Sequence, residues 1–203
     1  MSEMFGSSVF AAVAALALIA GGSGPVFALD KPADEKAKLK ACEKQLCSII
    51  LKRQAGGSDL ACNIGRTWEK SKIVNGVRQK RISWTFGDAQ CKVAVKMPRA
   101  GIISALTKPN FDLQLAKHTI NCQVEREEGV SNVALDMAPK MTFKAGKVDK
   151  IWLNVTDIKA PAIIKGAIWT VSQLEANIGV FHGEMIDEVN EFIHQKCAKR
   201  YPK

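Results

Sequence analysis

The sequence predicts an α+β fold: an antiparallel sheet of about six strands, covered on one face by N-terminal and C-terminal helices and stapled by disulfides. Two observations support this fold class. Apolar and polar residues alternate through the middle of the chain, roughly residues 64–155, whereas at both ends apolar residues recur at helical spacing. Strands grouped together with helices outside the group are typical of α+β proteins, and 203 residues are enough for one hydrophobic core.

The first 28 residues predict a secretory signal peptide. An apolar run, Val9–Ala20, is followed by a Gly- and Pro-containing stretch and then by the small-residue site Val26–Ala28. The run is shorter than the roughly 20 residues that span a bilayer. We therefore expect cleavage after Ala28, a periplasmic or secreted location, and a single mature domain over residues 29–203.

The mature chain is predicted to be strongly basic. The full chain has 29 Lys and Arg against 20 Asp and Glu, a net charge of +9, and loss of the signal peptide removes Glu3 alone, which gives +10. On an exported protein such a charge favours anionic envelope partners over nucleic acid.

Helices are predicted at both chain ends and at one internal position. The first runs from about Ala33 to Gly56, and the last begins with acidic and ends with basic residues, which suits the helix macrodipole. A short helix is expected over Arg99–Leu106. Residues 163–171 fit either a strand or a helix, and we expect a strand there and a helix from Ser172. The apolar faces of the terminal helices comprise Leu39, Cys42, Leu46, Ile49 and Ile50 in the first and Met185, Ile186, Val189, Phe192, Ile193 and Cys197 in the last.

The strands are predicted from alternation and from turn residues. Asn75-Gly76, the strongest two-residue hairpin signal, lies between two alternating stretches, residues 64–74 and 77–86. Further strands, each with one apolar face, are expected near residues 91–97, 118–124, 133–137 and 151–155.

Six cysteines follow the signal peptide, and an even number in an exported chain predicts disulfides. Cys42 and Cys47 lie on one predicted helix with their Cα atoms about 8.7 Å apart, beyond the roughly 7 Å that a disulfide can bridge. They must therefore have different partners. The favoured pairs are Cys47 with Cys62, Cys42 with Cys197, and Cys91 with Cys122; the alternative exchanges partners between Cys62 and Cys91.

The predicted hairpin concentrates positive charge between two tryptophans. Its register would place Lys70 opposite Arg81, and an anion between them would relieve their repulsion. The alternative is a solvated hairpin whose lysines protect a sheet edge from aggregation. The candidate ligand-binding residues are Trp68, Lys70, Lys72, Arg78, Lys80, Arg81 and Trp84.

The motifs of common enzymes are missing from the sequence. There is no zinc-type cysteine spacing, no Cys-x-x-Cys, and no phosphate-binding, dinucleotide-binding or serine-hydrolase motif. We therefore expect no catalytic residue, no metal and no cofactor. His118 shares a strand face with Ile120 and Cys122, which favours a structural role; a hydrolase that uses His118 or His182 with a carboxylate is the enzymatic alternative.

Several segments together resemble a family of uncharacterised exported proteins from α-proteobacteria related to rhizobia. The resemblance extends roughly from Cys42 to Cys197 and implies a periplasmic location, but it implies no activity. The segments that carry it are CEKQLCSII, DLACNIGRTW, WTFGDAQC, HTINCQVERE, KIWLNV and IGVFHGEMIDEVNEFI.

These observations favour an exported, non-enzymatic binding protein of the bacterial cell envelope. A sheet with one apolar face under helices often leaves a cavity, which would hold a lipid-like ligand. The basic surface would bind an anionic envelope component or an acidic protein, with peripheral membrane contact. A protein-interaction or inhibitor module is the alternative. An open apolar cavity lined by strand residues would support the binding protein, whereas a closed and filled core would count against it.

Overall fold

The computed structural model of the protein describes residues 29–78, 83–178 and 182–202, with the backbone alone for 174–178. The helical elements are α1 (Glu35–Lys52), α2 (Lys70–Arg78), α3 (Arg99–Thr107), α4 (Ala162–Ile178), α5 (His182–Glu191), the π-helical turn η1 (Phe192–Lys196) and α6 (Cys197–Arg200). The strands are β1 (Leu60–Trp68), β2 (Ala89–Met97), β3 (Asn110–Gln114), β4 (His118–Arg126), β5 (Gly129–Met137), β6 (Lys140–Lys144), β7 (Lys147–Trp152) and β8 (Val155–Lys159).

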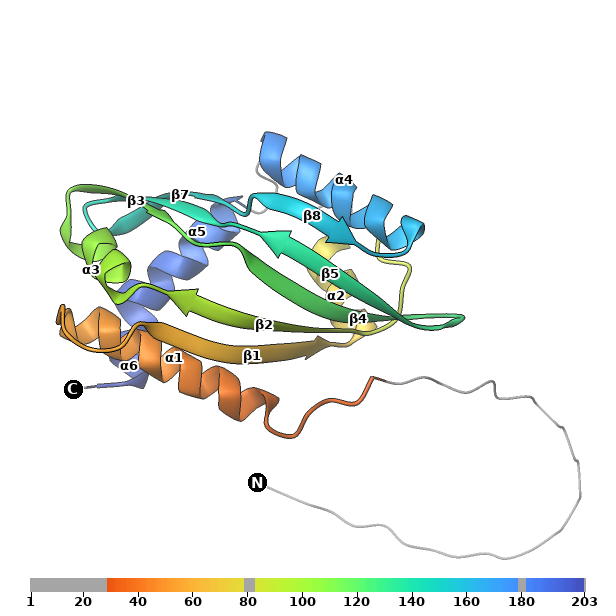
Figure 1. Ribbon diagram of the computed structural model, residues 1–203, viewed down its shortest axis with the longest axis horizontal. Helices are drawn as coiled ribbons and strands as arrows, with labels where there is room; N and C mark the ends of the chain where they lie inside the picture. The colour runs from red at the N-terminus through yellow and green to blue at the C-terminus, as the bar shows by residue number, and fades with distance from the viewer. Residues whose placement is uncertain (1–28, 79–82, 179–181, 203) are drawn as a thin grey trace, which may run out of the picture.

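The fold class is α+β, as predicted, but the described strands form two antiparallel sheets (Figure 1). The larger sheet has the strand order β1-β2-β4-β5-β8, and the smaller has the order β3-β6-β7. Figure 1 shows α1 beside the β1 edge of the larger sheet and α4 near the β8 edge. The expectation of about six strands in one sheet is therefore wrong in number and in division.

The division arises at a corner that two chain segments share. Pro139 separates β5 from β6, and Asn154, in the left-handed region at φ 48°, separates β7 from β8. The two breaks are hydrogen-bonded to each other: the amide of Ala138 donates to the carbonyl of Asn154 at 3.1 Å, and Asn154 Nδ2 donates to the carbonyl of Ala138 at 3.0 Å. The strand predicted near 151–155 therefore belongs to both sheets.

Helix α1 covers the otherwise open edge at β1 and runs antiparallel to it. Near its start, the Glu35 carboxylate accepts hydrogen bonds from the amide and the hydroxyl of Thr67, at 3.0 and 2.8 Å. Near its end, Ile49 and Ile50 are buried, and Arg53 closes the helix in a left-handed conformation. The predicted apolar arc of this helix is confirmed. An edge strand covered in this way cannot pair with another chain.

The C-terminal helices cover the β7 edge of the smaller sheet. The side chain of Asn190 on α5 accepts from the amide of Val148 at 2.8 Å and donates to the carbonyl of Val148 at 3.0 Å, replacing a missing strand partner. The predicted C-terminal helix is confirmed, with a π-helical turn inside it. Residues 162–178 form one helix, so the strand expected at 163–171 is wrong.

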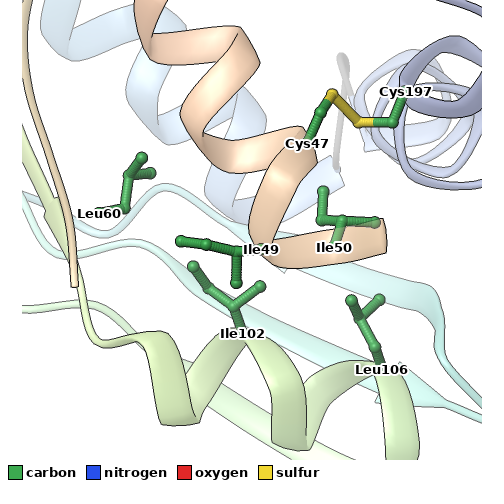
Figure 2. Close-up of a cluster of buried hydrophobic side chains, with 7 residues drawn as sticks. All are labelled: Cys47, Ile49, Ile50, Leu60, Ile102, Leu106 and Cys197. Atoms are coloured by element: carbon green, nitrogen blue, oxygen red, sulfur yellow. A yellow bond between two sulfur atoms is a disulfide. The ribbon is translucent and has the colours of Figure 1, made fainter. Parts of the chain in front are cut away.

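One core cluster joins both ends of the chain (Figure 2). It combines residues of α1, β1, α3 and α6, each less than a tenth exposed. A buried aliphatic side chain of this kind contributes about 1.5–3 kcal/mol. The cluster consists of Cys47, Ile49, Ile50, Leu60, Ile102, Leu106 and Cys197.

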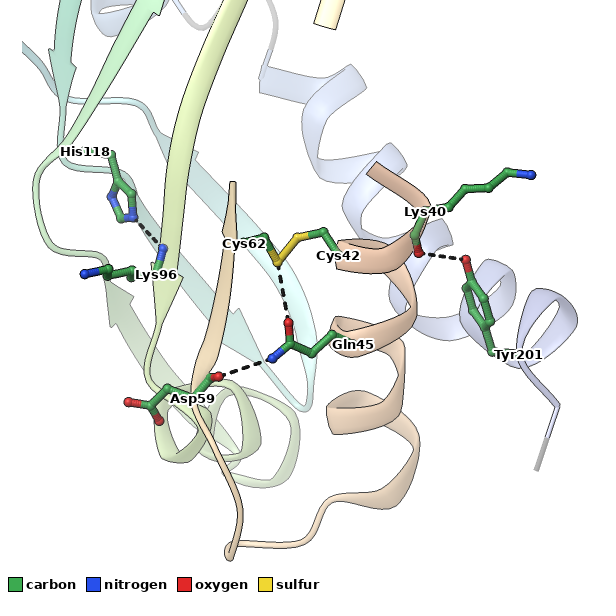
Figure 3. The surroundings of a disulfide bond; sticks show 8 residues. All are labelled: Lys40, Cys42, Gln45, Asp59, Cys62, Lys96, His118 and Tyr201. Carbon is green, nitrogen blue, oxygen red and sulfur yellow. Dashed lines mark hydrogen bonds between the residues drawn. A yellow bond between two sulfur atoms is a disulfide. The ribbon is translucent and has the colours of Figure 1, made fainter. Parts of the chain in front are cut away.

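All six cysteines of the described chain lie in three disulfides: Cys42–Cys62, Cys47–Cys197 and Cys91–Cys122. The exclusion of Cys42–Cys47 and the pair Cys91–Cys122 are confirmed, whereas the predicted pairs Cys47–Cys62 and Cys42–Cys197 are wrong. The reason is the register of α1 on β1: Gln45 lies beside Asp59, so Cys42, further from the loop, faces Cys62 (Figure 3). Cys47 is turned toward α6.

Among the described residues, none of the helices has the length and apolar character needed to cross a membrane.

Candidate functional site

A cavity of about 750 Å³ lies between the larger sheet and helices α2 and α4. The sheet forms its floor, α2 and α4 form its walls, and the corner between the two sheets closes one end. The floor consists of Ala89 and Cys91 on β2, Cys122 and Val124 on β4, and Val133, Leu135 and Met137 on β5. From the helices come Ile73 and Val77 on α2 and Ile164, Ala167, Ile168 and Trp169 on α4.

Strand register explains why the floor is apolar. Cys91 pairs directly with Cys122, and Cys122 with Val133, so these three side chains point to the same face. Their neighbours Lys92 and Asn121 point to the other face and are exposed. The single apolar face that alternation predicts for these strands is therefore confirmed, and it faces the cavity.

The described lining residues include no Asp, Glu, Lys, Arg or His. Three of the polar groups there are hydrogen-bonded to backbone carbonyls: Thr170 Oγ1 donates to Gly166, Ser172 Oγ to Ile168, and Trp84 Nε1 to Gly87, all at 2.9 Å. The walls therefore offer apolar contact and no acid, base or nucleophile of known activation.

Helix α2 occupies the position of the predicted hairpin, so that prediction is wrong. Asn75 and Gly76 lie inside the helix. The Asp88 carboxylate accepts the amide of Lys70 at 2.8 Å and so caps the first turn, while Ile73 and Val77 pack toward the cavity. Packing of the half-buried apolar side chains of this helix against the core outweighs the local preference of Asn-Gly for a turn.

The predicted ligand-binding residues are separated by this helix. Lys70, Lys72 and Arg78 are exposed on α2 and do not line the cavity, and Lys72 Nζ pairs with Glu69 at 3.4 Å. Lys80 and Arg81 lie outside the described residues, so the predicted pairing of Lys70 with Arg81 is not tested. Lys70 itself begins a helix and not a strand. Trp84 lines the cavity and packs edge-on against Phe86, whereas Trp68 lies at the end of β1 under the guanidinium of Arg66.

The cavity-lining side of α4 is the part that the sequence did not reveal. Residues 163–171 were ambiguous because Ile163, Ile164, Ile168 and Val171 fit both a strand and a helix. In the structure Ile164 is buried, while Ile163 and Trp169 are 64% and 52% exposed. The length of the apolar stretch could have identified this site, since exposed apolar side chains on a surface helix often mark a binding site.

The three histidines bind backbone groups. At His118, Nε2 accepts the amide of Lys96 at 3.1 Å (Figure 3). Nδ1 lies 2.6 Å from the carbonyl of Ala116, so the hydrogen is on Nδ1. His182 Nε2 accepts the amide of Ile151, and His194 Nε2 lies 3.1 Å from the carbonyl of Gly146. These contacts fit the structural role predicted for His118. Within the described residues, no cluster of three or more metal-ligating side chains occurs.

The opposite face of the larger sheet carries a polar hollow of about 710 Å³. It is lined by five Lys or Arg and two acidic side chains, together with His118, polar uncharged residues and several apolar residues. Lys92 and Lys96 are exposed there, while Lys38 pairs with Asp34 at 2.7 Å. The charged side chains are Lys38, Arg66, Lys92, Lys96 and Lys117 on the basic side and Asp34 and Glu35 on the acidic side.

Comparison of the chain with protein-family models, with curated proteins and with solved structures finds no match in any of the three. The resemblance to exported α-proteobacterial proteins therefore stays a prediction, and the function is argued from the geometry of the cavity.

Proposed function

We propose that this chain is an exported, non-enzymatic binding protein of the bacterial cell envelope that holds a lipid-like ligand between its larger sheet and helices α2 and α4. The observation that carries the proposal is the cavity of about 750 Å³, whose described lining residues include no charged side chain. Ligand sites in proteins are typically clefts of roughly 300–1,000 Å³ with mostly apolar walls and few polar groups.

The dimensions of the floor favour a chain-like ligand. Val133, Leu135 and Met137 all line the cavity, and at about 3.3 Å per residue they extend about 13 Å along β5. An acyl chain that lies along the strand gains about 0.8 kcal/mol for each methylene removed from water. Trp84 and Trp152 add broad apolar surfaces beside it.

Charge outside the cavity supports an anionic head group. Lys70 and Arg78 are exposed on α2, the helix whose Ile73 and Val77 line the cavity. The mature chain carries a net charge of +10 after removal of Glu3, which favours approach to anionic lipids. The apolar chain would lie inside, and the head group would lie in solvent near these cations.

The test compares two tryptophan substitutions on one helix. Ala167 is half-buried in the cavity wall, and Ala162 is exposed at the start of the same helix. We expect Ala167→Trp to fill the cavity and weaken binding of the fluorescent fatty acid cis-parinaric acid by about tenfold or more, which is about 1.4 kcal/mol. Ala162→Trp, which adds the same side chain at the surface, should bind as the unmodified protein does.

Native mass spectrometry of the exported protein gives a second readout, since a bound lipid adds a discrete mass. Absence of any bound lipid together with absence of probe binding would refute the proposal. Equal binding by the two tryptophan variants would remove the cavity as the site.

The polar hollow favours a second candidate, binding of an anionic envelope component on the other face of the sheet. Its probe is a vesicle of phosphatidylglycerol, and its variant is the double substitution Lys92→Ala with Lys96→Ala. Salt-sensitive vesicle binding that this variant loses, and that Ala167→Trp retains, would move the binding function to the polar face.

A further inference from the structure

The first described residue of the chain is bound to a carboxylate far away in the sequence. The backbone nitrogen of Leu29 donates a hydrogen bond to Oε1 of Glu125 on β4 at 2.6 Å, and the amide of Asp88 donates to Oε2 at 2.9 Å. The next residue is held as well, because Nε2 of the buried Gln90 donates to the carbonyl of Asp30 at 2.8 Å. The backbone at residues 29 and 30 is therefore fixed against the sheet.

Leu29 is also the residue that follows the predicted signal-peptide cleavage site, with Val26 and Ala28 at the small-residue positions. We propose that cleavage after Ala28 creates an α-ammonium group on Leu29 and that this group forms an ion pair with the half-buried carboxylate of Glu125. A signal-peptide endopeptidase hydrolyses the Ala28–Leu29 peptide bond with one water. The products are a carboxylate on Ala28 and an ammonium on Leu29.

The charge balance at Glu125 supports this assignment. The side chain is half-buried, and among the residues that the structure describes no Lys, Arg or His forms an ion pair with it. Removal of a carboxylate from water is unfavourable unless hydrogen bonds or a cation compensate for the lost hydration. The ammonium of the mature chain supplies that partner at a position where a nitrogen already lies 2.6 Å from Oε1. Hydrogen bonds between two ionised groups are shorter and stronger than those of a neutral amide.

Hydrogen bonds would connect the ion pair to α2, which forms a wall of the cavity. Glu125 accepts the amide of Asp88, and the Asp88 carboxylate in turn accepts the amide of Lys70, the first residue of α2. Maturation would thus complete a polar junction among the N-terminus, β4 and α2. The ion pair shares with the proposed function the premise that the chain is exported, but it does not require a ligand in the cavity.

The first measurement is the N-terminal sequence of the protein after expression of the full chain in an exporting bacterium. We expect the mature protein to begin at Leu29. A different first residue would overturn the proposal, because an ammonium elsewhere could not reach Oε1 in the observed geometry.

The second measurement is a thermal-unfolding cycle on exported protein. We expect Glu125→Gln to lower the Tm by roughly 2–4 °C, the shift of a pair worth about 1 kcal/mol in a domain of this size. Glu127→Gln, at an exposed neighbouring position, is the matched control and should leave the Tm unchanged. In a chain with Gly-Ser inserted between Ala28 and Leu29, which displaces the ammonium, the Glu125→Gln effect should fall by half or more.

An equal effect of Glu125→Gln with and without the insertion would overturn the ion pair. If Glu125→Gln does not accumulate, the Gly-Ser insertion alone decides the matter, since it moves the ammonium and leaves every side chain unchanged. An inserted chain as stable as the unmodified one would then refute the proposal.

Discussion

Asp136, on the polar face of β5, shows how single residues tune this sheet. Thr119 lies directly across the β4–β5 ladder and donates its hydroxyl hydrogen to Oδ1 at 2.6 Å, and Lys117 Nζ lies 3.0 Å from Oδ2. The Thr119 hydrogen bond, followed by that of Lys117, holds the pKa of Asp136 below its usual value of 3.8. The group therefore stabilises the folded state above its usual pKa, and this contribution is lost as the pH falls through the lower folded-state pKa.

Replacement of the hydroxyl tests this cause. In Thr119→Val we expect the pKa of Asp136 to rise toward its usual value, because the largest stabilising hydrogen bond to the carboxylate is lost while Lys117 remains. The measurement is an NMR titration of the side-chain carboxyl group. Thr142→Val is the control: it removes a similar hydrogen bond to Asp112 and should raise the pKa of Asp112 alone. An unchanged Asp136 titration in Thr119→Val would contradict the assignment.

Cysteine pairing shows what residue-level reasoning can and cannot reach. Helix geometry alone excludes Cys42–Cys47, because it depends on a rise and a rotation that every α-helix shares. Alternation alone places Cys91 and Cys122 on one face. The choice between Cys42 and Cys47 as the partner of Cys62 depends on where α1 lies along β1, and that offset is set by packing around Leu60 and Ile49. No periodicity in the sequence records it.

At the scale of elements, α2 is the clearest case of tertiary packing overriding a local signal. Asn75-Gly76 favours a tight turn, yet both residues lie in a helix whose Ile73 and Val77 face the cavity. The apolar positions 73, 74 and 77 fit a helix as well as a strand, so the sequence contained both readings. The division into two sheets was hidden in a similar way, because Pro139 and Asn154 act as breaks together and only one of them is a strong signal in sequence.

Gly76→Ala distinguishes helix from hairpin by the sign of its effect. A Cβ at Gly76 meets no atom within 4 Å, and helical Gly costs about 0.5–1 kcal/mol relative to Ala. We therefore expect Gly76→Ala to raise the free energy of unfolding by up to about 1 kcal/mol in equilibrium urea denaturation. In a hairpin turn that needs positive φ, the same substitution would be destabilising.

Gly146→Ala supplies the opposite sign in the same assay. Gly146 has φ 77°, and a Cβ there would lie 2.9 Å from the carbonyl oxygen of Leu106, so we expect clear destabilisation. If Gly76→Ala destabilised the protein as Gly146→Ala does, the helix at residues 70–78 would be wrong.

At the scale of the whole molecule, the two faces of the larger sheet have different surroundings. The apolar face predicted by alternation is covered at one end by α1, α3 and α6 and at the other by α2 and α4, and only the second region contains the cavity. The sequence indicates that helices must cover this apolar face. It does not identify α2 and α4 as those helices, because the residues of α2 and the first part of α4 were predicted as strands. Of the predicted ligand-binding residues that the structure describes, only Trp84 reaches the cavity.

One of the disulfides ties the two ends of the chain together. Cys47–Cys197 closes a loop of 150 residues and joins α1 to α6 inside a core cluster, whereas Cys42–Cys62 closes only 20. In the chain-entropy model, stabilisation grows with loop length, to about 5 kcal/mol for the long loop and about 3 kcal/mol for the short one. The bond between the termini should therefore contribute most to global stability.

We expect the double substitution Cys47→Ala with Cys197→Ala to lower the free energy of unfolding by about 2 kcal/mol more than Cys42→Ala with Cys62→Ala does. Equilibrium denaturation in guanidinium chloride measures both under conditions that keep the other disulfides oxidised. Cys91→Ala with Cys122→Ala, which opens a loop of 31 residues between adjacent strands, is the internal standard and should fall between them. If the short loop proved the costlier to open, local strand–helix anchoring at β1, and not the tie between the two ends of the chain, would be what limits unfolding.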